Sequence, residues 1–342
     1  PTRPGRDRVR ASSIRAPGDP SAARWVSDHG TRLPFVRPSG TSMTATPPQL
    51  AVEGYANSEF LDLAGVRTHV QTWAPDGDPV ATVLGLHHFY GSAQTYHRLG
   101  PRLAERGVAL VAFDRVGFGL TDRPAPGRSW TGPDSPYTRA FAVRQSVALF
   151  DHLGVDRGVA TGTSMGGAIT LELALAHPDR VAHAVPCSAP LTGDASAPAW
   201  LRRALRTPGL ATLGAATVRR LAGTIDHARV GRSWHDPTAV VDADVDAHAR
   251  FRGVDGWDRG LWWKWIADRP PALLDQLPEL ARSGTSVTAV GATHDRLVRP
   301  RVARRTARDA EGRYVELACG HVVHAEGADQ LAPLLLEIAG AR

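Results

Sequence analysis

The sequence predicts an α/β fold, in which a mostly parallel central sheet is flanked by helices and carries an inserted helical subdomain. Three observations support this prediction. The 342 residues are 42% hydrophobic and 22% charged, as in globular proteins with a sizeable core. From residue 58 onward, short apolar runs alternate with segments of helical period. The alternation stops at residues 191–279, which contain no plausible core strand.

Eight segments have the pattern of strands. Residues 58–63 and 66–72 alternate polar and apolar side chains around the turn Ala64-Gly65, which predicts an antiparallel hairpin at a sheet edge. The other six are apolar runs of the length expected for strands buried on both faces, and we expect them to be parallel. They are residues 81–87, 109–114, 158–163, 181–186, 286–291 and 313–317.

Segments of helical period lie between these strands at the spacing that parallel connections need. They are residues 95–106, 137–153, 165–176, 302–310 and 328–339. Residues 191–279 are rich in Trp, Arg and Ala and are interrupted by prolines. A structureless loop of this length is improbable in a compact domain, so we expect a helical cap inserted into a core formed by residues 51–190 and 280–342.

Most of the positive charge lies near the N-terminus. Residues 1–50 hold eight Arg against three Asp, whereas the net charge of the whole chain is +6. The remainder is therefore nearly neutral, which argues against a nucleic-acid partner. We expect residues 1–50 to be a disordered leader or an upstream extension of the reading frame, with Met43 as the true start. An organelle transit peptide is the alternative.

The sequence has no strong membrane or disulfide signal. No stretch approaches the roughly 20 apolar residues that a membrane span needs, so we expect a soluble protein without a membrane partner. The two cysteines, Cys187 and Cys319, cannot build a disulfide framework. This fits a reducing compartment, and we expect the cytoplasm.

The strongest local motif is Gly162-Thr163-Ser164-Met165-Gly166, a G-x-S-x-G sequence between a predicted strand and a predicted helix. In this context a strained turn exposes the serine Oγ, and the helix N-terminus favours the negative charge of an oxyanion. Ser164 is therefore the candidate nucleophile. A phosphate-binding loop needs Gly-Lys where this chain has Gly167-Ala168, so we expect no nucleotide and no other cofactor.

A serine nucleophile needs a general base and a carboxylate that orients the base. Asp295 and His321 each follow a predicted strand. Parallel strands bring their carboxyl ends to one edge of the sheet, so Ser164, Asp295 and His321 are expected to converge as a catalytic triad. Two alternatives stay open, with Asp194 as the acid or His324 as the base.

An acyl-transfer site also needs backbone donors for the oxyanion. We expect one from Met165, the residue after the nucleophile, and the second from Phe89, in the loop after the strand 81–87. The pair His87-His88 in this loop could indicate a metal site. Neighbouring side chains of an extended chain point to opposite sides, and no carboxylate lies nearby in the sequence, so we expect no metal.

Several stretches of the chain follow the pattern of one family. They are Gly162-Thr163-Ser164-Met165-Gly166-Gly167, Asp114-Arg115-Val116-Gly117-Phe118-Gly119-Leu120-Thr121, Asp295, and Gly320-His321 with Glu326 downstream. With them the chain resembles the α/β-hydrolase superfamily over about residues 58–340, in the branch with a cap after the sixth strand. The usual His-Gly before the oxyanion residue is His87-His88 here. The resemblance implies that Asp114 and Arg115 brace the loops beneath the site.

The nucleophile separates the reactions of that superfamily. Dehalogenases and epoxide hydrolases would require an aspartate, so Ser164 favours hydrolysis of a carboxylic ester through an acyl-enzyme. The alternatives are a carbon–carbon bond hydrolase or another reaction on the same triad, and a ligand-binding receptor without catalysis. Trp262, Trp263 and Trp265 of the predicted cap are expected to line the substrate pocket, with core packing as the alternative for each. A tryptophan-lined pocket predicts a small to medium substrate that is apolar or aromatic.

Overall fold

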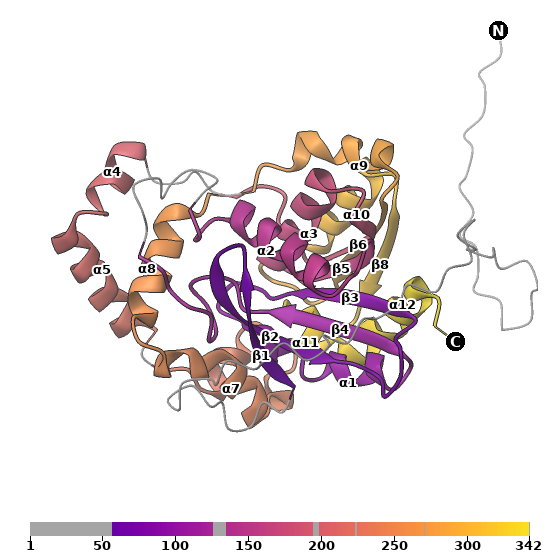
Figure 1. Ribbon diagram of the computed structural model, residues 1–342, viewed down its shortest axis with the longest axis horizontal. Coiled ribbons are helices and arrows are strands. Elements are labelled where there is room, and N and C mark those ends of the chain that lie inside the picture. The colour runs from indigo at the N-terminus through magenta and orange to yellow at the C-terminus, as the bar shows by residue number, and fades with distance from the viewer. Residues whose placement is uncertain (1–56, 126–134, 194–197, 223, 270, 342) are drawn as a thin grey trace, which may run out of the picture. The chain divides into compact units, whose positions relative to one another are not determined.

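The computed structural model describes residues 57–125, 135–193, 198–222, 224–269 and 271–341, and all of them belong to the unit Leu33–Arg342. The leader predicted over residues 1–50 and the alternative acid Asp194 lie outside the described residues. The described chain forms a central sheet with helices on both faces, and a further group of helices lies between its sixth and seventh strands (Figure 1).

The sheet has eight strands in the order β1-β2-β4-β3-β5-β6-β7-β8. β1 and β2 form the edge hairpin, β2 pairs antiparallel with β4, and the remaining neighbours are parallel. This confirms the predicted α/β fold and the predicted direction of the strands. The strands are β1 Ser58–Leu63, β2 Val66–Trp73, β3 Ala81–Leu86, β4 Val108–Phe113, β5 Gly158–Thr163, β6 Val181–Cys187, β7 Ser286–Ala292 and β8 Arg313–Leu317.

Helices cover both faces of the sheet (Figure 1). Alternate residues of a strand face opposite sides, so Leu84 of β3 packs in one apolar cluster and Val83 in the other. The first face is covered by α2 (Arg139–His152), α3 (Met165–Ala176), α9 (Leu277–Ser283) and α10 (Pro300–Asp309). The second face is covered by α1 (Leu99–Ala104) and α12 (Ala328–Ala339), with the short α11 (Val323–Glu326) before α12.

The predicted helix 95–106 is two shorter elements. A 3₁₀ helix, η2 (Ala93–Tyr96), precedes α1. Proline has no amide hydrogen and fits a helix best in its first turn. Because α1 begins at Leu99, Pro101 falls within that first turn. A continuous helix from residue 95 would have placed Pro101 in its second turn.

The chain between Thr192 and Ala272, called the inserted segment below, leaves the core and returns to it at one place. Thr192 and Ala272 form an antiparallel bridge, and the amide of Leu273 donates to the carbonyl oxygen of Leu191 at 3.0 Å. The helices of the inserted segment are α4 (Ala199–Ala204), α5 (Pro208–Leu221), α6 (His227–Gly231), η3 (Pro237–Ala239), α7 (Asp242–Ala249), η4 (Arg250–Gly253) and α8 (Trp257–Ala267).

None of the helices in the described ranges is long and apolar enough to span a membrane.

Candidate active site

Ser164 forms the turn between β5 and α3. Its backbone has φ 57° and ψ −120°, a conformation that costs a non-glycine residue on the order of 1–3 kcal/mol. The turn is tight, because a Cβ on Gly166 would lie 1.9 Å from the carbonyl oxygen of Leu86. The amide of Ser164 donates to the carbonyl oxygen of Cys187 at 2.9 Å. The turn thus holds a partly exposed serine at the carboxyl end of β5.

Asp295 and His321 lie side by side in the loops after β7 and β8. His321 Nδ1 is 2.8 Å from Asp295 Oδ2, and both side chains are buried. Asp295 Oδ1 accepts from the amides of Leu297 at 2.8 Å and Val298 at 2.9 Å. Burial raises the pKa of Asp295, but the hydrogen bond and charge of His321 and the Val298 amide bring it below its usual value. An ionised Asp295 accepts a hydrogen from His321 Nδ1, which leaves His321 Nε2 to accept a proton.

Both ring nitrogens of His324, the alternative base, are already engaged. Nδ1 lies 2.7 Å from Thr163 Oγ1 and Nε2 lies 3.0 Å from Thr95 Oγ1. The ring stacks on that of Tyr96, with centroids 4.4 Å apart. Burial, with smaller contributions from neighbouring histidines, lowers the pKa of His324 to about 3. His324 is therefore a neutral core residue, and His321 is the histidine that meets the carboxylate of Asp295.

The segment after β4 is tied to β2 and to the loop after β3. Buried Asp114 accepts from the amides of Ala93 at 2.6 Å and Leu120 at 2.7 Å, and it lies 2.8 Å from His69 Nδ1. Burial raises the pKa of Asp114, but His69 and the other donors bring it down to about 2. Gly119 has φ 48°, and a Cβ there would lie 1.8 Å from Asp114 Oδ2. These contacts have the bracing role that the family resemblance implies.

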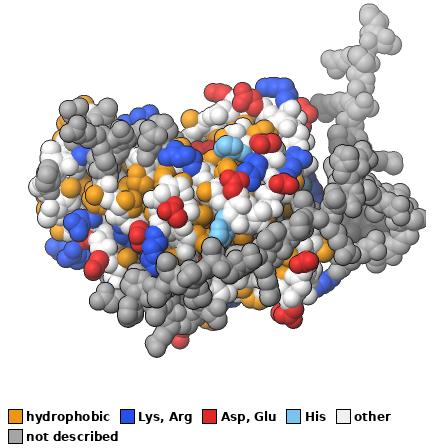
Figure 2. Space-filling model, in the orientation of Figure 1, with side chains coloured by type: hydrophobic (Ala, Val, Ile, Leu, Met, Phe, Trp, Pro, Cys, Tyr) orange, Lys and Arg blue, Asp and Glu red, His pale blue; other side chains and the backbone are white. Residues whose placement is uncertain are grey.

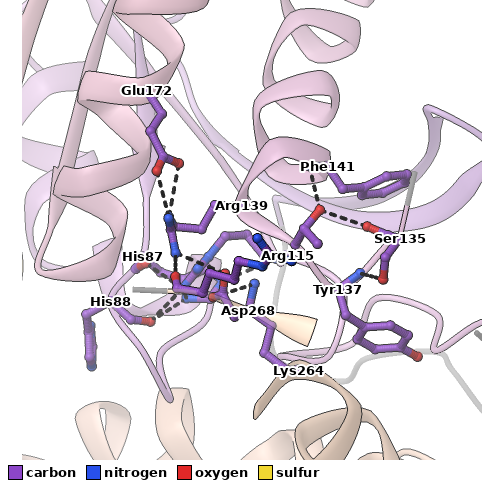
Figure 3. A network of polar contacts seen from close by, with 12 residues as sticks. His87, His88, Arg115, Ser135, Tyr137, Arg139, Phe141, Glu172, Lys264 and Asp268 are labelled. Carbon is purple, nitrogen blue, oxygen red and sulfur yellow. Dashed lines mark hydrogen bonds and ion pairs between the residues drawn. The ribbon is translucent and has the colours of Figure 1, made fainter. Parts of the chain in front are cut away.

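The loop after β3 carries the backbone amide of Phe89. Arg115 is fully buried, and its Nη2 donates to the carbonyl oxygens of His87 at 2.9 Å and His88 at 3.1 Å (Figure 3). Burial and the nearby Arg115 lower the pKa of His87, so its ring is neutral. The amides of Phe89 and Met165 donate no hydrogen bond within the part of the chain that the structure describes.

A small cavity adjoins this loop. Its volume is about 60 Å³, and it lies between the Phe89 loop and helices α5 and α8. Trp265, one of the three predicted pocket residues, borders the cavity and is 53% exposed. The lining residues are Phe89, Tyr90, Val218, Leu221, Ala222, Arg229, Leu261 and Trp265.

The other two predicted pocket tryptophans pack against neighbouring parts of the structure. The indole of Trp262 lies against Gly214 of α5, where a Cβ would approach it to 2.1 Å. Trp263 contacts the ring of Tyr137 edge-on, with centroids 5.5 Å apart. The lining of the cavity beside Phe89 includes neither residue. In the described structure, Trp262 joins α8 to α5 and Trp263 joins α8 to the core.

The inserted segment also contacts the His321 loop directly. The amide of His321 donates to the carbonyl oxygen of Ser233 at 2.8 Å. The carboxylate of Glu326 accepts from the amides of Gly320 at 2.6 Å and His235 at 2.9 Å. No pattern in the sequence indicates that Ser233 and His235 are neighbours of His321. Their backbone groups make these contacts, and a backbone group leaves no signal in the residue pattern.

The described residues contain no group of three or more His, Cys, Asp or Glu side chains that could hold a metal ion. The adjacent His87 and His88 make separate contacts. His87 Nε2 accepts from the amide of Arg115 at 3.1 Å, whereas His88 Nε2 lies 3.0 Å from His248 Nε2. The two side chains therefore do not share one site.

Known proteins share this architecture. A family model of the alpha/beta hydrolase fold matches residues 81–328. A 2-hydroxymuconate semialdehyde hydrolase from Pseudomonas putida is 27% identical over 237 residues, which cover 66% of this chain and 75% of that protein. The lipase LipV from Mycobacterium tuberculosis is 28% identical over 291 residues, which cover 80% of this chain and 98% of that protein. The crystal structure of an enol-lactonase from Burkholderia xenovorans covers 82% of this chain and 100% of its own, with a TM-score of 0.59 and 22% identity. This last likeness concerns the fold alone.

Proposed function

The chain belongs to the α/β-hydrolase family, and on that premise we propose that it hydrolyses a carboxylic ester with Ser164 as nucleophile, His321 as base and Asp295 as the orienting carboxylate. The observation that carries this proposal is the 2.8 Å contact between His321 Nδ1 and Asp295 Oδ2. It occurs at the sheet edge where the strained turn holds Ser164. The fully engaged ring of His324 favours His321 as the base.

The proposed reaction has two steps. In the first, Ser164 Oγ attacks the ester carbonyl while His321 Nε2 takes the hydroxyl proton, and Asp295 stabilises the imidazolium that forms. The oxyanion accepts hydrogen bonds from the amides of Phe89 and Met165. His321 then protonates the departing alcohol, which leaves the acyl group on Ser164. In the second step, His321 removes a proton from water, the resulting nucleophile attacks the acyl carbonyl, and the acid departs as Ser164 regains its proton.

The surroundings of the Phe89 loop favour an apolar substrate. Seven of the eight residues around the adjoining cavity have apolar or aromatic side chains, and Arg229 is the exception. Figure 2 shows apolar side chains gathered on the surface over the inserted helices. The exposed large apolar side chains that the inserted segment has among the described residues are Trp200, Leu210, Leu213, Leu221, Val241 and Trp265.

The size of the cavity limits what it holds. About 60 Å³ accommodates a small acyl or alkyl group and not a whole ligand of ordinary size, for which pockets of roughly 300–1,000 Å³ are typical. We therefore propose that Trp265 contacts one end of a small to medium ester, and that the inserted segment acts as a cap that moves to admit the rest. Trp262 and Trp263 keep the α8 helix in place in this scheme.

A second candidate is the hydrolysis of a carbon–carbon bond by the same three residues. The likeness to a 2-hydroxymuconate semialdehyde hydrolase favours it, because the substrate in that name is a semialdehyde and not an ester. Both candidates use Ser164, His321 and Asp295.

The test is a substrate panel assayed with the wild type and Ser164→Ala. The panel contains p-nitrophenyl esters with acetyl, butyryl and benzoyl groups, simple lactones, and 2-hydroxymuconate semialdehyde. We expect ester turnover in the wild type and a loss on the order of 10⁶-fold in kcat in Ser164→Ala, as in other serine hydrolases. Turnover of the semialdehyde alone would favour the second candidate. Ester turnover that survives in Ser164→Ala would refute the assignment of the nucleophile.

A further inference from the structure

Two buried histidines from distant parts of the chain meet beside the Phe89 loop. His88 follows β3 and His248 lies on α7 of the inserted segment. Their Nε2 atoms are 3.0 Å apart, and the two residues are only 7% and 9% exposed. One of the two nitrogens must carry a hydrogen and the other must present a lone pair.

The remaining contacts of His248 decide which nitrogen is the donor. His248 Nδ1 lies 2.6 Å from the carbonyl oxygen of Asp244, which can only accept, so Nδ1 carries the hydrogen. Burial lowers the pKa of both His248 and His88, so both rings are neutral. Neutral His248 therefore accepts at Nε2, and His88 donates from its Nε2.

Helix α7 makes further contacts with the same part of the core. Ser92 Oγ donates to the carbonyl oxygen of Ala247 at 2.7 Å. Buried Asp244 accepts from Arg98 Nη2 at 2.5 Å and lies 2.9 Å from His97 Nε2. The loop after β3 is thus held from the core by Arg115 and from the inserted segment by α7.

We infer that His248 is a positioning residue that fixes the loop carrying the Phe89 amide, by accepting a hydrogen bond from His88. This inference rests on the proposed ester hydrolysis, in which that amide stabilises the oxyanion. His88 is adjacent to Phe89 in the chain, so the place of its ring constrains the direction of the next amide. Without an acceptor at residue 248, the buried Nε2–H of His88 would lack a hydrogen-bond partner, and the His88 ring would turn toward another acceptor.

The test compares His248→Gln with His248→Asn. A glutamine amide reaches about as far as the Nε2 of histidine and can accept from His88, whereas an asparagine amide ends near the position of Nδ1 and cannot. Both variant side chains are polar and neutral, and they differ in whether their amide can reach His88 Nε2. His227→Phe is the matched control, because His227 also lies on a helix of the inserted segment but pairs with Asp242 at the surface, at 3.0 Å.

The readouts separate a positioning role from a structural one. For each variant we would measure kcat and KM on p-nitrophenyl butyrate per active site titrated with an organophosphonate, the Ki of benzeneboronic acid, and the melting temperature. Removal of one oxyanion donor costs on the order of 10²–10³ in kcat, and a displaced donor costs less. We expect His248→Asn to lower kcat by about 10–100-fold with KM nearly unchanged, and to raise the Ki by a similar factor. His248→Gln should recover most of kcat, and His227→Phe should match the wild type.

Two outcomes would overturn the inference. One is a kcat of His248→Asn within about twofold of the wild type, and the other is an equal loss in His248→Gln and His248→Asn. If His248→Asn fails to fold, a kcat of folded His248→Gln near the wild-type value supports the inference, and a loss as large as tenfold overturns it. Failure of the proposed function is a separate result, since it would appear in the wild-type substrate panel as turnover of the semialdehyde alone, or as ester turnover that persists in Ser164→Ala.

Discussion

A buried group of charges between the inserted segment and the core leads to a quantitative prediction: replacing Lys264 by Met should stabilise the protein at neutral pH. The group holds three cations, Arg115, Arg139 and Lys264, and two carboxylates, Glu172 and Asp268 (Figure 3). Lys264 Nζ is 3.1 Å from Asp268 Oδ2, Arg139 Nη1 is 3.1 Å from Asp268 Oδ1, and Arg139 Nε is 2.8 Å from Glu172 Oε1. One positive charge in this group therefore has no ionised counterpart within it.

The pKa of Lys264 sets the size of the effect. Burial lowers this pKa from an ordinary 10.5 to about 8, against the opposing attraction of Asp268. At about 1.4 kcal/mol per pH unit, this difference corresponds to about 3 kcal/mol. The pKa is lower in the folded state than in the unfolded state, so the charged form disfavours folding. The penalty is complete below pH 8 and disappears as the pH rises through 10.5.

Lys264→Met removes the charge and keeps a flexible apolar chain. At pH 7 the variant should therefore gain up to about 3 kcal/mol in the free energy of unfolding, or roughly 6 °C in melting temperature. The difference from the wild type should shrink between pH 8 and pH 10.5. The measurement is urea unfolding followed by tryptophan fluorescence at pH 7, 8.5 and 10.

The partner of Lys264 provides the control. Asp268→Asn leaves three cations facing one carboxylate and should lose about 3–5 kcal/mol, as is usual when one member of a buried ion pair is removed. Lys264→Met in the Asp268→Asn background should recover part of this loss. A Lys264→Met variant that is less stable than the wild type at pH 7, or a difference that does not change with pH, would refute the reasoning.

Three further predictions follow from single residues. Ser164→Ala and Ser164→Gly should both lose activity, but only glycine adopts the positive φ of this turn without strain. Ser164→Gly should therefore be the more stable of the two by about 1 kcal/mol in urea unfolding. Equal stabilities of the two variants would contradict the backbone strain at residue 164. Trp265→Ala should raise KM for benzoyl esters far more than for acetyl esters, whereas Trp262→Ala should mainly lower the melting temperature. The proposal that Trp265 contacts the substrate fails if the two variants behave alike. Because Asp114 has a folded pKa of about 2 against an ordinary 3.8, it contributes about 2 kcal/mol at neutral pH, and the stability difference between the wild type and Asp114→Asn should shrink as the pH falls from 4 to 2. A difference that is constant over that range would show that the charge of Asp114 is not what stabilises the fold.

Features that depend on neighbouring residues were predictable from the sequence. The edge hairpin and the six parallel strands begin and end within one residue of the predicted bounds. Helix α3 begins directly after Ser164, as the motif indicated. The proximity of Asp295 and His321 was also expected, since strand ends meet at one edge of a parallel sheet. Their catalytic roles stay a prediction.

Features that depend on which surfaces meet were not predictable in this way. The sequence does not distinguish three tryptophans of helix α8, yet Trp265 borders a cavity, Trp262 packs against α5 and Trp263 packs against Tyr137. The contact of His88 with His248 joins residues 160 positions apart. No periodicity within either segment indicates such a partner.

Hydrophobic period and turn chemistry act over a few residues, so the strands, the strained serine turn and the chain order of the serine, aspartate and histidine follow from the sequence alone. Three other features emerged only from the packed fold: β3 lies between β4 and β5, His321 and not His324 meets Asp295, and α7 holds the Phe89 loop. These features depend on the burial and hydrogen bonding of side chains against distant partners. That environment exists only once the layers have packed.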